Sequence, residues 1–247
     1  MNRKYYVIIF LLLVVFFIGV SILKYPYINH SVADIGMSER VNAFVSQTDN
    51  AFNKPDVTYT DNDILSDNAY TDLHDDMQVY NALIFEQRQS ELQSETDYEI
   101  PSFILADYGL ESEVFAILSI PAMDLEMPIY LGATDEHLRG GAAHLSQTSL
   151  PIGGENTNCV IAGHRGYNGA PYFRYIDKLQ IGDTVTVTNL WDTLAYTVVD
   201  IRIIDPDDID AIHIQEGREL LTLLTCHPYA SGGRQRYLVV CERIEPR

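Results

Sequence analysis

The chain has 247 residues and is strongly acidic, with 35 Asp and Glu against 16 Lys and Arg and a formal net charge of −19. Phosphate groups are bound mainly by Lys and Arg, so this charge argues against a nucleic-acid-binding protein. Three cysteines are too few for a disulfide framework, and their odd number leaves at least one thiol without a partner in the chain.

The first predicted element is an apolar segment near the N-terminus. Arg3 and Lys4 precede an apolar run over residues 5–23, close to the ~20 residues that cross a bilayer as a helix. The alternative, a cleaved signal peptide, has a shorter apolar core followed by small residues, whereas bulky Lys24-Tyr25-Pro26-Tyr27 follows here. We therefore expect residues 1–24 to be a retained signal anchor, with the remainder of the chain outside the cell.

Residues 25–113 are predicted to form an acidic stalk with one helix and a possible lid. The segment 31–67 is polar with scattered apolar residues and no clear period, which predicts a stalk or a loosely ordered segment. Residues 69–93 predict an amphipathic helix, because apolar side chains recur there at spacings of three and four: Leu73, Met77, Tyr80, Leu83 and Ile84. The segment 94–110 breaks this period, and Ile100-Pro101 disfavours a continuing helix.

Short strands dominate residues 114–247. The predicted strands are 115–121, 126–132, 159–163, 184–188, 194–199 with an extension over 201–204, 220–226 and 237–241. Residues 189–192 predict a hairpin turn, and 135–139 a short helical turn. Closely spaced strands with turn signals favour a mostly β fold, a closed barrel with short helices.

Three reactive side chains stand at the ends of predicted strands. Cys226 ends an apolar strand before His227-Pro228, His164 follows the strand over 159–163, and Arg236 begins the next strand after a Gly-containing loop. A thiol, an imidazole and a guanidinium are a candidate nucleophile, acid/base and oxyanion donor. Positive charge beside a thiol favours its reactive thiolate form, which Arg236 is placed to do.

Other residues are weaker candidates for these roles. His227 adjoins Cys226, and successive strand side chains point to opposite faces. Arg234 lies in the loop beside Gly232-Gly233 and stays a minor alternative to Arg236. We expect His144 to be structural, although it is also a candidate for lining the same cleft.

The other cysteines and the motif search add no further chemistry. Cys159 and Cys241 lie within apolar strand patterns, where a thiol behaves as a small buried hydrophobe. The chain contains no C-x-x-C, H-E-x-x-H or P-loop motif, so neither a metal nor a nucleotide cofactor is indicated.

These motifs together resemble the sortase family, and within it the class C, pilus-assembling branch. The resemblance runs from about residue 117 to 243 and is carried by Ile120-Pro121, Met127-Pro128-Ile129-Tyr130-Leu131-Gly132, Gly141-Ala142-Ala143-His144-Leu145, Ala162-Gly163-His164-Arg165-Gly166 and Thr222-Leu223-Leu224-Thr225-Cys226. It implies an eight-stranded sortase β-barrel with a site made by Cys226, His164 and Arg236. Near the site the chain departs from the family in two ways: the loop before Arg236 is one residue longer, and His227 stands where class C usually has threonine.

The resemblance also implies a function. It points to a single-pass membrane protein of a Gram-positive cell envelope, a cysteine transpeptidase without a cofactor that cleaves an LPXTG-like sorting signal. The acyl product would pass to a lysine of a pilin subunit. A housekeeping sortase would use a cell-wall precursor amine, and a cysteine hydrolase would use water. A non-enzymatic scaffold is the remaining reading, and the intact triad counts against it.

A lid ahead of the barrel is another feature that the resemblance brings. Class C members usually carry an Asp-Pro-aromatic motif there, which this chain lacks. Asp97-Tyr98 and Asp107-Tyr108 are the two pairs that remain as candidates for a lid tip.

Overall fold

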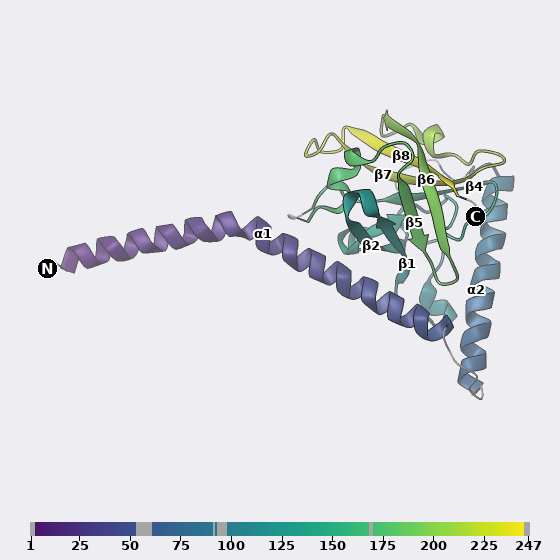
Figure 1. Ribbon diagram of the computed structural model, residues 1–247, viewed down its shortest axis with the longest axis horizontal. Helices are drawn as coiled ribbons and strands as arrows, with labels where there is room; N and C mark the ends of the chain where they lie inside the picture. The colour runs from purple at the N-terminus through teal and green to yellow at the C-terminus, as the bar shows by residue number, and fades with distance from the viewer. Residues whose placement is uncertain (1–2, 53–60, 91, 93–97, 168–169, 245–247) are drawn as a thin grey trace.

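Eight strands close into a single barrel in this computed structural model, which describes residues 3–52, 61–90, 92, 98–167 and 170–244 (Figure 1). The longer elements are α1 (Arg3–Phe52), α2 (Asp61–Glu86), β1 (Val114–Ile120), β2 (Leu125–Leu131), α3 (Asp135–Gly140), β3 (Ala142–His144), β4 (Thr157–Ala162), β5 (Thr184–Thr188), β6 (Thr193–Ile204), β7 (Glu219–His227) and β8 (Gln235–Arg243). Short 3-10 helices are η2 (Leu105–Tyr108), η3 (Pro121–Met123), η4 (Tyr172–Lys178) and η5 (Ile209–Ile212).

The strand order around the barrel is β1-β2-β3-β4-β7-β8-β6-β5, which confirms the predicted closed eight-stranded β-barrel. Strand β7 pairs in parallel with β4 on one side and antiparallel with β8 on the other. The prediction lacked β3, because its three residues are too few to show an alternating pattern. The order matters for function, because β4, β7 and β8 are the strands that carry the three predicted site residues.

The hairpin of β5 and β6 shows how the alternating pattern builds the barrel core. The threonines of the hairpin face outward, and the side chains between them point into the barrel. The buried inward residues are Val185, Val187, Leu194, Tyr196 and Val198. The predicted turn is present, and the Asn189 carboxamide oxygen accepts hydrogen bonds from the backbone N–H groups of Trp191 and Asp192, both at 2.8 Å.

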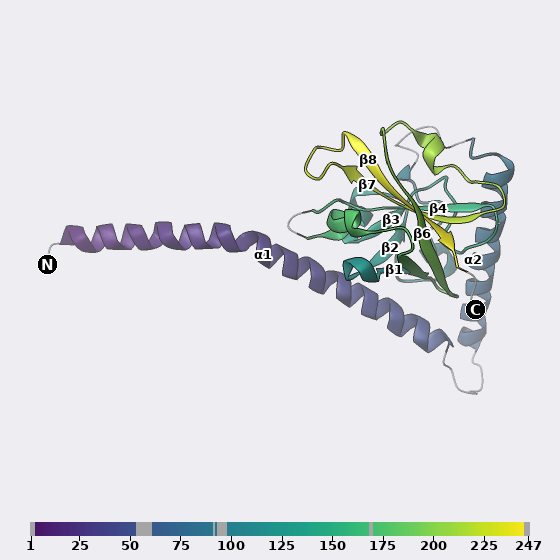
Figure 2. The ribbon, with the colours of Figure 1, turned by 45° about the horizontal axis from the view of Figure 1, so that its top comes forward.

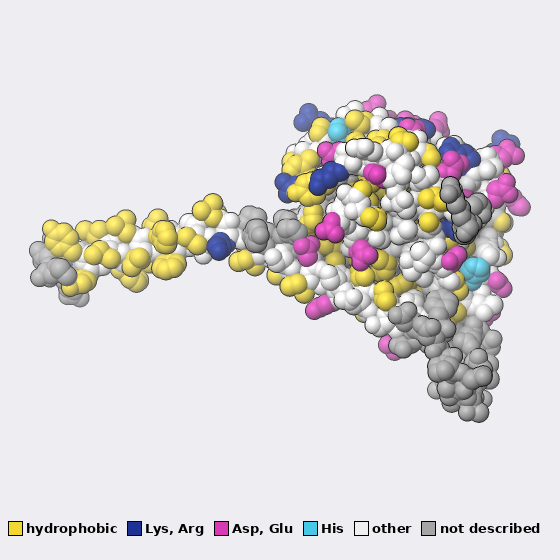
Figure 3. Space-filling model, in the orientation of Figure 1, with side chains coloured by type: hydrophobic (Ala, Val, Ile, Leu, Met, Phe, Trp, Pro, Cys, Tyr) yellow, Lys and Arg dark blue, Asp and Glu magenta, His cyan; other side chains and the backbone are white. Residues whose placement is uncertain are grey.

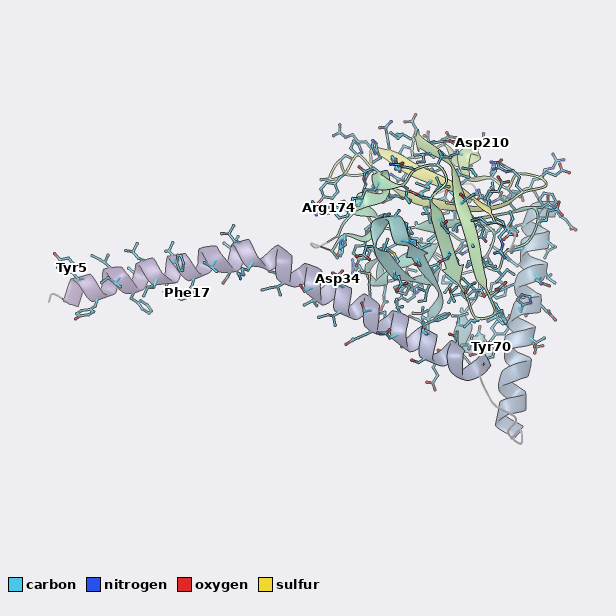
Figure 4. All side chains as sticks on the ribbon, viewed as in Figure 1. Tyr5, Phe17, Asp34, Tyr70, Arg174 and Asp210 are labelled. Atoms are coloured by element: carbon cyan, nitrogen blue, oxygen red, sulfur yellow. The ribbon has the colours of Figure 1, made fainter. Side chains whose placement is uncertain are left out.

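The first half of α1 has the properties of a membrane span. Tyr5–Tyr25 is 21 residues long with a mean hydropathy of 3.1, and none of it is buried in the protein. Such a helix is about 30 Å long, the thickness of the hydrocarbon core of a bilayer. Apolar side chains surround this part of the helix (Figure 3), and Tyr5 and Phe17 project from it away from the barrel (Figure 4).

Loose order, one of the two alternatives predicted for residues 31–67, is wrong for residues 31–52 and 61–67, which are helical. The second half of α1 packs against β1 and β2 and buries Met37, Val41 and Phe44. Their spacings of four and three place them on one helix face. The sequence did not reveal that face, because other apolar residues of the segment lie off it and are exposed: Val32, Ile35 and Val45.

Helix α2 covers most of the segment predicted to be helical, but it begins earlier and ends at Glu86. It buries Leu73 and Met77 completely. Its C-terminal end is fastened to the barrel by Gln89, whose amide donates to the Gln147 carbonyl at 3.2 Å and accepts from the Ile214 N–H at 2.6 Å. At its other end Tyr70 accepts a hydrogen bond from Gln47 of α1 (Figure 4). The region ahead of the barrel therefore packs on it through α1 and α2.

Candidate active site

Cys226 is the exposed thiol of the three free cysteines, near the end of β7. Cys159 and Cys241 are buried, as predicted from their apolar strands. Burial raises the pKa of both thiols, that of Cys241 to about 12, because a thiolate is poorly solvated there. At neutral pH the two buried thiols are therefore protonated and unreactive, which leaves Cys226 as the candidate nucleophile.

Arg236 lies directly opposite Cys226 in the antiparallel register of β7 and β8. Opposed residues in such a pair have Cβ atoms about 4.5–5.5 Å apart, so the thiol is within the reach of an arginine side chain at this position. Arg236 Nη1 also donates to the Gly233 carbonyl at 2.7 Å, which holds the side chain over the loop. Arg234, the alternative, is exposed in that loop outside β8.

Gly233 lies against both the Cys226 thiol and the Arg236 guanidinium. A Cβ atom built on it would stand 3.3 Å from Cys226 Sγ and 3.1 Å from Arg236 Nη1. Its φ of +76° is a conformation that favours glycine. The neighbouring Gly232 has nearly the same φ, +72°, but no atom lies within 4 Å of its Cβ position. Only one of the two glycines is therefore needed for space as well as for backbone conformation.

We expect Gly233→Ala to slow acylation of Cys226 far more than Gly232→Ala. Both variants carry the same left-handed backbone strain, of order 1 kcal/mol, but only the Gly233 methyl group pushes the thiol and guanidinium apart. Single-turnover acylation rates, with thermal unfolding as the control for strain, test this. Equal rates in the two variants would show that the close approach at Gly233 is unimportant.

His164 follows β4, the strand on the other side of β7. The parallel register pairs Ala162 with Leu224. Beyond this pair, the Gly163 N–H still donates to the Leu224 carbonyl at 3.1 Å, and Thr225 Oγ1 donates to the Gly163 carbonyl at 2.7 Å. Extended by one residue past the end of the ladder, the same sequence offset makes His164 and Cys226 the next pair. The three predicted residues therefore come from three adjacent strands at one end of the barrel.

Aromatic residues hold the His164 imidazole. Its ring is stacked on Tyr167 with centroids 4.7 Å apart, and it meets the edge of Tyr172 at 6.0 Å. Burial lowers the pKa of His164 from its ordinary value; Asp135 opposes this shift and Arg139 adds to it. The surroundings of the ring therefore favour its neutral form.

Asp135 and Arg139 of α3 should shift the pKa of His164 in opposite directions. Asp135→Asn removes a negative charge and should lower the pKa of His164 further, whereas Arg139→Gln removes a positive charge and should raise it. NMR titration of the His164 ring in the two variants measures both shifts at once. Shifts of the same sign would contradict this electrostatic account and indicate a change of packing around the ring.

His144 is structural, as expected. It is fully buried at the end of β3, and its Nε2 donates to the carbonyls of Thr148 and Ser149 at 3.2 and 3.0 Å. These bonds shape the loop after β3 rather than the reactive surface. Burial lowers the pKa of His144 to about 4 from 6.5, because the charged ring would lose its hydration.

This shift predicts a pH-dependent contribution to stability. An unfolded chain takes up the His144 proton below about pH 6.5, but the folded chain does so only near pH 4. The stabilisation is therefore full above pH 6.5 and is lost as the pH falls towards 4, by about 3 kcal/mol in total. Urea unfolding of the wild-type chain and His144→Gln across this range tests it. The difference between their unfolding free energies should narrow by that amount.

A cavity of about 200 Å³ begins beside Arg236, and its walls are mostly apolar. Residues that line it include Tyr98, Leu138, Leu145, Ile204, Leu224 and Arg236. Nothing in the sequence marked these apolar residues as neighbours, because they come from separate loops and strands. The cavity offers an extended apolar group a place next to Arg236.

The segment after residue 97 lies along this cavity. The Tyr98 carbonyl accepts from the Ala133 N–H at 2.8 Å, and the Ser146 hydroxyl donates to the Ile100 carbonyl. Asp97 itself lies outside the described residues. The other proposed lid tip is elsewhere, since Tyr108 donates to Asp76 of α2 at 2.7 Å. Of the two predicted pairs, the one containing Tyr98 is therefore at the candidate site.

Within the described ranges, no group of three or more His, Cys, Asp or Glu side chains could hold a metal ion.

Comparison with known proteins agrees with this geometry. The model of the Sortase domain matches residues 118–244. Sortase D of Bacillus subtilis (strain 168) is 32% identical over 130 residues, which cover 52% of this chain but 63% of that protein, less than two thirds of its length. Sortase A of Bacillus anthracis is 24% identical over 69% of this chain and 80% of its own.

Solved structures are similar over more of the chain. Sortase C1 of GBS Pilus Island 1 has a TM-score of 0.65 at 27% identity and covers 85% of this chain and 93% of its own. Sortase C-1 of Streptococcus pneumoniae has a TM-score of 0.57 at 33% identity, with 69% and 91% covered. Sortase C of Clostridium perfringens SM101 has a TM-score of 0.61 at 28% identity, with 83% and 99% covered.

Proposed function

This chain belongs to the sortase family, and on that premise we propose that it is a cysteine transpeptidase that cleaves an LPXTG-like sorting signal and joins the acyl product to a lysine of a pilin subunit. The observation that carries this proposal is the exposed Cys226 on β7, flanked by Arg236 on β8 and by His164 after β4. The choice of a pilin acceptor is supported by the likeness to sortases C, including one named as pilus-related.

The first half-reaction forms a thioester. The Cys226 thiolate sulfur attacks the backbone carbonyl carbon of the sorting signal, and Arg236 donates hydrogen bonds to the oxyanion that develops. When this intermediate collapses, the C–N bond breaks and protonated His164 gives its proton to the departing amine. The enzyme then holds the acyl group on sulfur, and His164 is neutral.

The second half-reaction returns the enzyme to its starting state. A lysine amine attacks the thioester carbonyl carbon, and neutral His164 accepts the proton that the amine loses. The C–S bond breaks, Cys226 leaves as thiolate, and an amide joins the two proteins. The cycle begins from a thiolate–imidazolium pair, and burial of His164 disfavours its protonated form. Burial of His164 therefore limits the fraction of molecules that can begin the cycle.

We also propose that the cavity beside Arg236 binds the apolar part of the sorting signal and that the Tyr98–Pro101 segment acts as its lid. This proposal is supported by Tyr98, which lines the cavity and is hydrogen-bonded to its wall at Ala133. A signal entering along the wall would have to displace this segment or pass beneath it. Release of the lid would then precede acylation.

The membrane topology is part of the same proposal. Tyr5–Tyr25 would cross the membrane, with Arg3 and Lys4 inside and the barrel outside the cell. In Figures 1 and 2 the loop between β7 and β8 extends from the barrel on the side where α1 leaves it, which supports an active site turned towards the bilayer.

The test records intact masses of the full chain in detergent micelles. The chain is incubated with an LPXTG-type peptide, with and without a lysine-bearing pilin domain. A thioacyl adduct on Cys226 that the pilin converts to an amide-linked product is the expected result. Conversion only by a cell-wall precursor amine would indicate a housekeeping sortase, and release only as free acid would indicate a hydrolase. An inert thiol would contradict the proposal.

A further inference from the structure

Arg165, the residue after His164, has a buried guanidinium that no sequence pattern singled out. Its side chain is 7% exposed. Nη1 donates to His227 Nδ1 at 2.7 Å, and Nη2 lies 3.5 Å from Asp177 Oδ1. Its guanidinium carbon lies 5.1 Å from the centre of the Tyr237 ring. Burying a guanidinium is unfavourable, and Asp177, at 60% exposed, offsets this only partly.

The hydrogen bond between Arg165 and His227 joins the two residues that directly follow the proposed acid/base and the proposed nucleophile. His227 comes directly after Cys226, as Arg165 comes directly after His164. The pair has the same sequence offset as Ala162 and Leu224, the last paired residues of the β4–β7 ladder. Strand β4 ends at Ala162 and its last hydrogen bonds to β7 are made by Gly163, so beyond Gly163 the ladder no longer fixes the distance between the two segments. The Arg165–His227 bond fixes it again beyond the reactive residues.

The chemistry of the contact is directional. A guanidinium has only donors, so His227 Nδ1 must be the acceptor and the ring is neutral with its proton on Nε2. The Tyr237 ring packs on both partners, 5.6 Å from the centre of the His227 ring. On β8, Tyr237 adjoins Arg236 and is paired with Thr225 of β7, the residue before Cys226. The cluster of Arg165, His227 and Tyr237 thus touches the segments that carry all three proposed catalytic residues.

We propose that Arg165 and His227 are positioning residues that hold His164 abreast of Cys226. The inference rests on the proposed function, because it assigns these residues to the geometry of acyl transfer. Neither side chain contacts the substrate in this account. Their role is to keep the proton donor and the thiolate at a fixed separation while the lid and the sorting signal move.

The test uses three single variants and one double variant of the full chain. His227→Phe keeps a ring against Tyr237 but removes the acceptor, whereas His227→Asn keeps an acceptor oxygen near the position of Nδ1. Arg165→Met removes the donor, and Arg165→Met/His227→Phe removes both. His227 is only half-buried, so its variants remain informative even if Arg165→Met folds poorly.

We expect His227→Phe and Arg165→Met to lower kcat about 10- to 100-fold with KM changed less than about threefold, as for a small misplacement of reacting groups. His227→Asn should keep at least about half of kcat, because the hydrogen bond survives. The double variant should be no worse than the poorer single variant, since both remove one interaction. Thermal unfolding reports stability separately.

Three results would overturn the inference. One is an unchanged kcat per folded molecule in His227→Phe and Arg165→Met, which would leave them a role in stability alone. Another is a decrease in kcat in His227→Asn as large as that in His227→Phe. The third is a double variant in which the fold-decrease in kcat equals the product of the fold-decreases in the two single variants.

Alkylation of Cys226 by iodoacetamide separates this inference from the proposed function, because it needs no sorting signal. We expect the alkylation rate at pH 7 to fall in His227→Phe and Arg165→Met but not in His227→Asn, since a displaced His164 no longer supports the thiolate. If the wild-type chain formed no thioacyl adduct while this pattern held, only the proposed substrate would be wrong. Equal rates in all four chains would contradict the positioning role itself.

Discussion

Cys226→Ala is expected to abolish formation of the thioacyl adduct and to lower transpeptidation about 10,000-fold or more, as when the nucleophile of a comparable covalent enzyme is removed. Cys226 is exposed at the end of β7 and is not part of the barrel core. The variant should therefore fold as the wild-type chain does. Its loss of activity can then be assigned to chemistry, with intact mass and product formation as the two readouts.

Cys159→Ala and Cys241→Ala are the matched controls. Both remove a thiol, but these thiols are buried and their pKa values are raised, so neither supplies a thiolate at neutral pH. Each variant should lose about 1 kcal/mol of stability from the small cavity that it creates, while activity per folded molecule stays near that of the wild-type chain. An adduct that persisted in Cys226→Ala and vanished in either control would identify a different nucleophile.

The second large effect is expected at Arg236. Arg236→Met should lower kcat about 100- to 1,000-fold, the usual cost of removing one donor to an oxyanion. The thiol should still be present and alkylatable, because Arg236 acts on the charge that develops after attack. Arg236→Lys should recover only part of the rate, since an ammonium group lacks the planar fork of donors. Single-turnover acylation measured by intact mass separates this step from later acyl transfer.

Arg234→Met is the control for Arg236, because it removes the same charge from the same loop region. Arg234 is exposed and lies outside the β7–β8 register, whereas Arg236 is opposite Cys226. We expect Arg234→Met to keep nearly full activity. Full activity in Arg236→Met, or a large loss only in Arg234→Met, would remove Arg236 from the oxyanion role.

The barrel was predictable from the sequence because its strands are short and their side chains alternate between core and solvent. Val185 and Val187 on β5 are buried, while the threonines before, between and after them face outward. The Asn189 turn carries its own hydrogen-bonding side chain. These signals are local, so the sequence displays them without knowledge of the fold.

The sequence singled out the candidate site residues for a related reason. Cys226, His164 and Arg236 each stand where an apolar strand gives way to polar or glycine residues, and such positions are accessible in a β fold. The pattern could not show that β7 lies between β4 and β8. That order, which brings the three side chains to one end of the barrel, is a property of the closed sheet.

By itself, then, the sequence determined the β-barrel, the apolar helix at the N-terminus and the three strand ends with reactive side chains, because each is written in adjacent residues. Only the tertiary structure decided that Met37, Val41 and Phe44 form a packed helix face, that Tyr98 lines the cavity, and that Arg165 meets His227. Those contacts join segments far apart in the chain. Whether a polar segment is ordered, or a guanidinium buried, depends on the surface that folding brings against it.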